Sequence, residues 1–137
     1  MVGLNDSEYA NRVFEYALYI AKKCEVEQLL LINVIEEFGL TIESWEKQES
    51  VIKEIEQNTK ELLEKYKSKA QSQAFTRVKV MMAEGNAGEE ILRAADKENV
   101  DAIVIGHRGR SIKAELLLGS VSQNVIHHAK CPVVIVR

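Results

Sequence analysis

Leu29-Leu30-Leu31-Ile32-Asn33-Val34-Ile35 is an apolar run that only one amide side chain interrupts. A run of this length is typical of a β-strand buried on both faces of a sheet, because a half-exposed strand alternates apolar and polar residues. Further strands are indicated over Arg77–Ala83, Asp101–Ile105 and Pro132–Val136. A first strand over Met1–Leu4 falls short of the usual length of about 5–6 residues. Either that strand is stunted or the sequence begins inside it.

Helical patterns fill the intervals between these strands. Asn5-Asp6-Ser7 predicts a helix cap, and apolar residues then recur every three or four positions as far as Cys24. A long amphipathic helix is indicated over residues 43–72, with Ile52 and Tyr66 among the residues of its apolar stripe. A short helix is indicated after Gly85-Asn86-Ala87-Gly88, and a last one over Ser120–Ala129. The alternation predicts one doubly wound α/β domain, residues 1–137, with a five-stranded, mostly parallel sheet and helices on both faces. Ligands bind such sheets at the carboxyl ends of strands, so we expect a site in the loops after strands 1 and 4.

Composition excludes several classes of function. The chain has 137 residues, and its 18 basic and 21 acidic side chains give a net charge of −3, which disfavours non-specific nucleic-acid binding. No apolar run reaches the roughly 18 residues of a membrane span, and no secretory signal is visible. We therefore expect a cytoplasmic protein with no nucleic-acid or membrane partner. Cys24 and Cys131 lie far apart in the sequence, which predicts two reduced, buried thiols.

The segment after the fourth strand is rich in glycine and in positive charge. It runs Gly106-His107-Arg108-Gly109-Arg110-Ser111-Ile112-Lys113-Ala114-Glu115-Leu116-Leu117-Leu118-Gly119-Ser120. Glycine lets a backbone approach a ligand closely, and the helix that opens at Ser120 offers unpaired N–H groups and a positive dipole end to phosphate. Arg108, Arg110 and Lys113 add positive charge. Together these features predict a polyphosphate cradle, although each glycine alone would be explained as a turn residue.

The spacing G-x2-G-x9-G-[ST], placed between a strand and the last helix, resembles the universal stress protein family, and within it the ATP-binding branch. The resemblance extends over essentially the whole chain: Ser7-Glu8 resembles the family's first turn, Leu30–Ile35 its second strand, and Glu84-Gly85-Asn86-Ala87 its third turn. The stretches Gly119–Val125 and Cys131-Pro132-Val133 match its C-terminal region. The fold expected from it is Rossmann-like, with strand order 3-2-1-4-5.

The resemblance also implies which positions contact a nucleotide. The phosphates would be held by Gly106, Gly109, Gly119 and Ser120, with Val121 and Ser122 beside them and Arg108 adding its charge. The ribose and base would meet Ile105, the backbone of Val34, and Gly3, Leu4 and Asn5. The family usually has Asp where this chain has Asn5, which bears on base preference because an amide offers one acceptor and two donors. Any metal would be Mg²⁺ brought by the nucleotide and held mainly by its phosphates.

Three hypotheses of function follow. The first is an ATP-binding regulatory or stress-response module. The second is a slow ATP hydrolase or phosphotransferase of the same fold, for which the sequence offers no evident base. The third is a partner-binding module that uses no nucleotide. We also expect a homodimer through the C-terminal strand, because an apolar edge strand is a template for a second copy and the resembled family commonly dimerises in this way.

Overall fold

The computed structural model describes residues 1–36, 45–107 and 118–137, with the side chains of 45–48 left undescribed. Nine elements alternate along these residues: β1 (Val2–Gly3), α1 (Ala10–Lys23), β2 (Leu29–Ile35), α2 (Trp45–Ser72), β3 (Val78–Glu84), α3 (Ala87–Lys97), β4 (Ile103–Gly106), α4 (Ser120–His128) and β5 (Val133–Val136). The five strands form one sheet of order β3-β2-β1-β4-β5, and every neighbouring pair is parallel. The predicted doubly wound fold and its strand order are confirmed.

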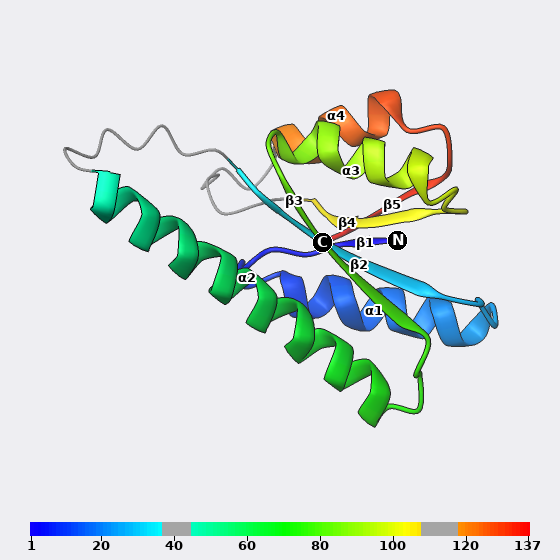
Figure 1. The fold of residues 1–137 in the computed structure, drawn as a ribbon. Helices are drawn as coiled ribbons and strands as arrows, with labels where there is room; N and C mark the ends of the chain where they lie inside the picture. The colour runs from blue at the N-terminus through cyan, green and yellow to red at the C-terminus, as the bar shows by residue number, and fades with distance from the viewer. Residues whose placement is uncertain (37–44, 108–117) are drawn as a thin grey trace.

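The helices form two layers, one on each face of the sheet (Figure 1). Helices α1 and α2 cover one face, where Phe14, Leu18, Leu31 and Tyr66 belong to one apolar core. Helices α3 and α4 cover the other, where Ile32, Ile91, Ile103 and Val125 belong to a second core. Strand β2 contributes to both cores, which explains why its sequence is apolar at nearly every position.

Strand β1 is as short as its sequence indicates, yet it lies in the centre of the sheet. Val2 pairs with Leu31 of β2 and with Val104 of β4. The backbone N–H of Leu4 also donates to the carbonyl of Ile32 at 2.8 Å, so β2 guides the chain beyond the strand. The central position of β1 creates the point where the strand order reverses, between β1 and β4.

Three local predictions are wrong. Asn5-Asp6-Ser7 does not cap α1, which has Tyr9 at its N-cap and no side-chain cap. Both thiols are free as predicted, but Cys24 is exposed at the end of α1 and Cys131 is only half-buried against the second core. Ile52, expected on the packed stripe of α2, is 43% exposed. No helix in the described ranges is long and apolar enough to cross a membrane.

Candidate functional site

The predicted site residues that the structure describes lie at the carboxyl ends of β1, β2 and β4 and at the start of α4. Gly3 ends β1 and is followed by Leu4 and Asn5, while Val34 stands one residue before the end of β2. Ile105 and Gly106 end β4, and Gly119 to Ser122 begin α4. Because the strands are parallel, these segments share one edge of the sheet, beside the reversal of strand order. Arg108 and Gly109, together with Arg110, Lys113 and Glu115, lie outside the described residues.

The N-terminus of α4 lies at this edge. Gly119 is the N-cap residue, no side chain of the described residues caps the helix, and its first turn holds no acid. The φ and ψ of Gly119 are −66° and 153°, an extended conformation that any residue adopts. What glycine supplies here is therefore the absence of a side chain in front of the first N–H groups of the helix. Such an end accepts an anion through backbone donors and the helix dipole.

Ser120 and Ser122 have different surroundings at this helix end. Ser120 is exposed, so its hydroxyl is available to a ligand. Ser122 is only 3% exposed, and its Oγ donates to the carbonyl of Gly106 at 2.7 Å. That bond joins the start of α4 to the end of β4, so Ser122 positions the helix, and its proton is not offered to a phosphate.

The residues assigned to the base and ribose turn their side chains into the cores. Leu4 is 4% exposed, Val34 8% and Ile105 4%, so a ligand at this edge would meet their backbones. A Cβ at Gly3 would lie 2.8 Å from Cγ2 of Ile105 and 3.4 Å from Cδ1 of Ile91. Gly3 is therefore required for the packing of β1 beneath α3, whatever ligand lies above it.

Asn5 is held in a local turn. Its Oδ1 accepts from the backbone N–H of Ser7 at 3.1 Å and from the Ser7 hydroxyl at 2.6 Å. A backbone N–H only donates, so the atom facing it must be the amide oxygen of Asn5. The group that Asn5 has left for a ligand is its NH₂ donor.

Two further residues of this region were missed by the sequence reasoning. Asn33 is a buried amide in β2 whose Nδ2 donates to the carbonyl of Leu4 at 2.7 Å, which fixes the turn that carries Asn5. The signal for it was the single polar residue in an otherwise apolar strand. His107, in the glycine-rich segment, could by its sequence be either solvent-facing or a phosphate contact, and the structure places its ring centroid 5.3 Å from that of Tyr9. Its Nδ1 is buried and has no hydrogen-bond partner in the described part of the chain.

The backbone of His107 connects three elements. Its N–H donates to the carbonyl of Val136 in β5 at 2.8 Å, and its carbonyl accepts from the N–H of Gly119 at 2.9 Å. The N-cap of α4 is thus fixed to the end of β4. Among the described residues no group of three or more His, Cys, Asp and Glu side chains could hold a metal ion.

A parallel sheet of this order, with an open helix N-terminus at its switch point, defines a doubly wound α/β protein of the Rossmann-like type. The sequence model of the universal stress protein family matches residues 1–137, and the chain belongs to that family. Universal stress protein MJ0531 of Methanocaldococcus jannaschii is 33% identical over 140 residues, which covers 100% of this chain and 80% of that protein.

Solved structures agree on the fold. MJ0577, another universal stress protein of M. jannaschii, superposes with a TM-score of 0.83 at 31% identity, over 98% of this chain and 93% of that chain. A universal stress protein solved in complex with cAMP gives a TM-score of 0.74 at 23% identity, over 99% of this chain and 94% of that chain. At that identity the likeness shows the fold alone.

Proposed function

We propose that this universal stress protein binds ATP, with Mg²⁺ on its phosphates, in the crevice between the carboxyl ends of β1 and β4. Its role is that of a nucleotide-dependent regulatory module of the stress response. The phosphates lie against the N-terminus of α4, and the base and ribose lie over the ends of β1 and β2. Arg108 and Gly109, which the motif assigns to the phosphates, lie outside the described residues.

One observation carries the proposal: a helix N-terminus with no side-chain cap, preceded by a glycine whose conformation does not require glycine. A capping side chain would satisfy the first N–H groups of α4, whereas Gly119 leaves them to solvent or to an anion. The position of this helix end at the switch point supports a nucleotide phosphate over a chance anion. A universal stress protein of the same fold was solved in complex with cAMP, which is itself an adenine nucleotide.

Of the ATP-binding module and the ATP hydrolase, we propose the binding module. A hydrolase needs a group that orients or deprotonates the attacking water within hydrogen-bond reach of it. Glu8, an acid in the turn after β1, is exposed, so burial does not hold its carboxylate toward the start of α4. Occupancy of the crevice, and not product formation, is then the signal that the protein transmits.

The test is to release and identify the nucleotide from purified protein and then to follow ATP with Mg²⁺ over time. We expect about one ATP per chain after loading, and phosphate release no faster than in a control without protein. Protein that neither carries nor takes up ATP would overturn the proposal. Sustained phosphate release would instead assign the chain to the hydrolase alternative.

We also propose that two copies pair through β5. Strand β5 is at one edge of the sheet, and its residues are apolar throughout. The carbonyl of Pro132 accepts from the N–H of Ile103 in β4, and the carbonyl of Val136 accepts from the N–H of His107, the residue after β4. By the two-residue period of a parallel strand, the N–H and C=O groups of Val133 and Ile135 therefore point away from the sheet. These free groups are the ones that a second β5 would bind around a two-fold axis.

A further inference from the structure

A cavity lies near the amino ends of the strands, away from the carboxyl ends where we place the nucleotide. It has a volume of about 430 Å³ and lies between the last turns of α3 and the connection from α4 to β5. Its lining includes Leu92, Asp96, Val100, Ala129, Lys130 and Cys131. Its volume is within the range of about 300–1,000 Å³ that small-molecule sites occupy. Cys131 comes two residues before β5, so the cavity is at the amino ends of the strands and a ligand there does not touch the crevice.

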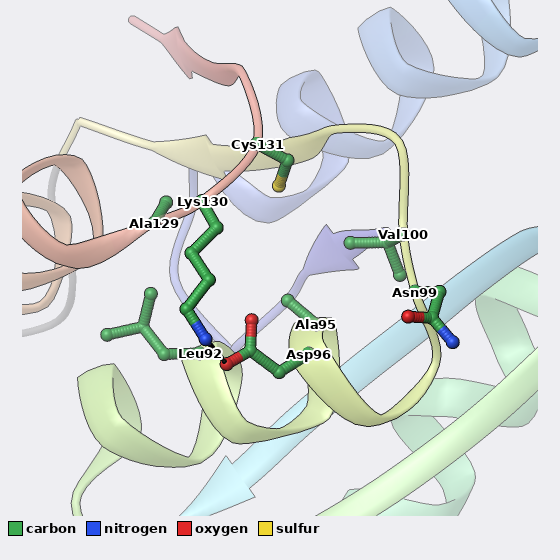
Figure 2. Close-up of a pocket in the computed structure, with 8 residues that line it drawn as sticks. All are labelled: Leu92, Ala95, Asp96, Asn99, Val100, Ala129, Lys130 and Cys131. Carbon is green, nitrogen blue, oxygen red and sulfur yellow. Dashed lines mark hydrogen bonds and ion pairs between the residues drawn. The ribbon is translucent and has the colours of Figure 1, made fainter.

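The lining combines apolar walls with one nucleophile. Leu92, Val100 and Ala129 form apolar surface, and Cys131 is a free, half-buried thiol among them. Figure 2 shows the thiol directed into the space between α3 and the α4–β5 connection. A reagent that reaches the thiol from this side must fit the cavity, which selects reagents by size and shape.

Two opposite charges cross the mouth of the cavity. Lys130 Nζ lies 2.5 Å from Asp96 Oδ2 (Figure 2), with the two side chains 79% and 52% exposed. An ion pair so exposed is worth little and exchanges partners readily. A zwitterionic ligand would replace it in full, with its carboxylate on Lys130 and its ammonium group on Asp96.

We propose that this cavity is a site for reversible thiolation of Cys131 by a small zwitterionic disulfide of the amino-acid or peptide-thiol class. The Cys131 thiolate attacks one sulfur of the disulfide. The disulfide bond of the reagent breaks, a new bond forms between Cys131 Sγ and the attacked sulfur, and the other half leaves as a thiolate that takes up the proton released by Cys131. One disulfide is consumed and one is formed, so the incoming disulfide is the only oxidant.

Cys24 provides an internal control, because it is a free, exposed thiol at the end of α1 with no part in this cavity. The protein is incubated with oxidised glutathione or with the neutral bis(2-hydroxyethyl) disulfide, and the occupancy of each cysteine is measured by peptide mass spectrometry. We expect the ratio of Cys131 to Cys24 modification to be several-fold higher with glutathione disulfide. Equal ratios for the two reagents, or a Cys131 that stays unmodified while Cys24 reacts, would overturn the proposal.

Three variants separate recognition from simple exposure. Lys130→Ala and Asp96→Ala should each lower the glutathione ratio by about two- to fivefold, the size of one exposed ion pair, and leave the neutral reagent unaffected. Ala129→Leu should reduce modification of Cys131 by both reagents, because it fills the cavity, and leave Cys24 unchanged. If Ala129→Leu does not fold, the two surface variants still decide the matter, since a glutathione ratio that both leave unchanged contradicts the assigned contacts.

Discussion

At the end of β1, Asn5 uses its amide oxygen to hold Ser7 and leaves only a donor for a nucleotide base. Adenine presents an amino group at its 6-position, which needs an acceptor. We predict that Asn5→Asp keeps the turn with one oxygen and offers the other to that amino group. The preference for ATP over GTP should rise about tenfold, the size of one hydrogen bond to a charged group. Competition titrations measure it.

Asn58→Asp is the matched control for this change, because it adds the same charge on an exposed position of α2. It should leave the ratio of the ATP and GTP dissociation constants unchanged. A preference that stays the same or falls in Asn5→Asp would show that residue 5 does not contact the base.

The two serines of α4 should separate stability from binding. Ser122→Ala removes the bond from the Ser122 hydroxyl to the carbonyl of Gly106 inside the protein. We expect the free energy of unfolding to fall by about 1 kcal/mol. Ser120→Ala changes an exposed side chain, so stability should stay constant while ATP affinity falls. Urea unfolding and calorimetry of both variants check this, and a stable Ser122→Ala protein would contradict the assigned bond.

Residue types and spacing predicted that the described segments lie together at the carboxyl ends of β1, β2 and β4, but not what each side chain does there. The motif placed Ser120 and Ser122 together, yet their roles differ because one faces solvent and the other faces β4. The bonds of Asn33 to Leu4 and of Asn5 to Ser7 depend on tertiary geometry and on a turn conformation. No periodicity in the sequence records either of these.

At the scale of elements, α1 and α2 are joined by a charged contact at the surface. Lys69 Nζ lies 2.6 Å from Glu15 Oε1, and this hydrogen bond is the main cause that lowers the pKa of the Glu15 carboxyl below its ordinary value of 4.5. Because the pKa of Glu15 is lower in the folded protein than in the unfolded chain, the contact stabilises the protein at pH values above the unfolded pKa. That stabilisation is lost as the pH falls through the folded value.

We therefore predict that Lys69→Met lowers the free energy of unfolding at neutral pH by less than about 1 kcal/mol, since both side chains are about a third or more exposed. The difference from the unmodified protein should vanish near pH 2, where the carboxyl is protonated in both states. Lys53→Met, which breaks the exposed pair with Glu49 within α2, serves as the comparison. A deficit that persists unchanged in acid would assign the effect to packing of Lys69 over the Phe14 ring.

Element order and type followed from the sequence because the strands are buried on both faces and the helices on one. The residues at which helices begin and end were harder to predict from the sequence. Helix α1 begins at Ala10, although Asn5-Asp6-Ser7 carries three good capping side chains, because Asn5 and Ser7 bond each other in the turn above the sheet. Cys24 falls at the next apolar position in the spacing of α1, but the helix ends at Lys23, so Cys24 is not on its packed face.

At the scale of the whole molecule, the pairing of β5 should depend on its outward backbone groups. We predict that Ile135→Pro, which removes an outward N–H, converts a dimer into a monomer that still binds ATP. A lysine substitution at Val136 would not test the interface cleanly. The Val136 side chain is 8% exposed and packs in the core, so the variant would also disturb the fold. Ile135→Val keeps the N–H and should stay dimeric. Light scattering at micromolar concentration decides, and a monomeric unmodified protein or a dimeric proline variant would exclude this interface.

If ATP phosphates lie against the start of α4, a side chain at residue 119 should weaken ATP binding, and calorimetric titration of Gly119→Val beside the unmodified protein measures this. We expect a variant that is folded by circular dichroism and thermal unfolding and whose ATP affinity is at least about tenfold weaker, a loss of about 1.4 kcal/mol or more. A β-branched side chain at the N-cap occupies the space in front of the N–H groups of α4. A folded Gly119→Val protein that binds ATP as tightly as the unmodified chain would contradict the account.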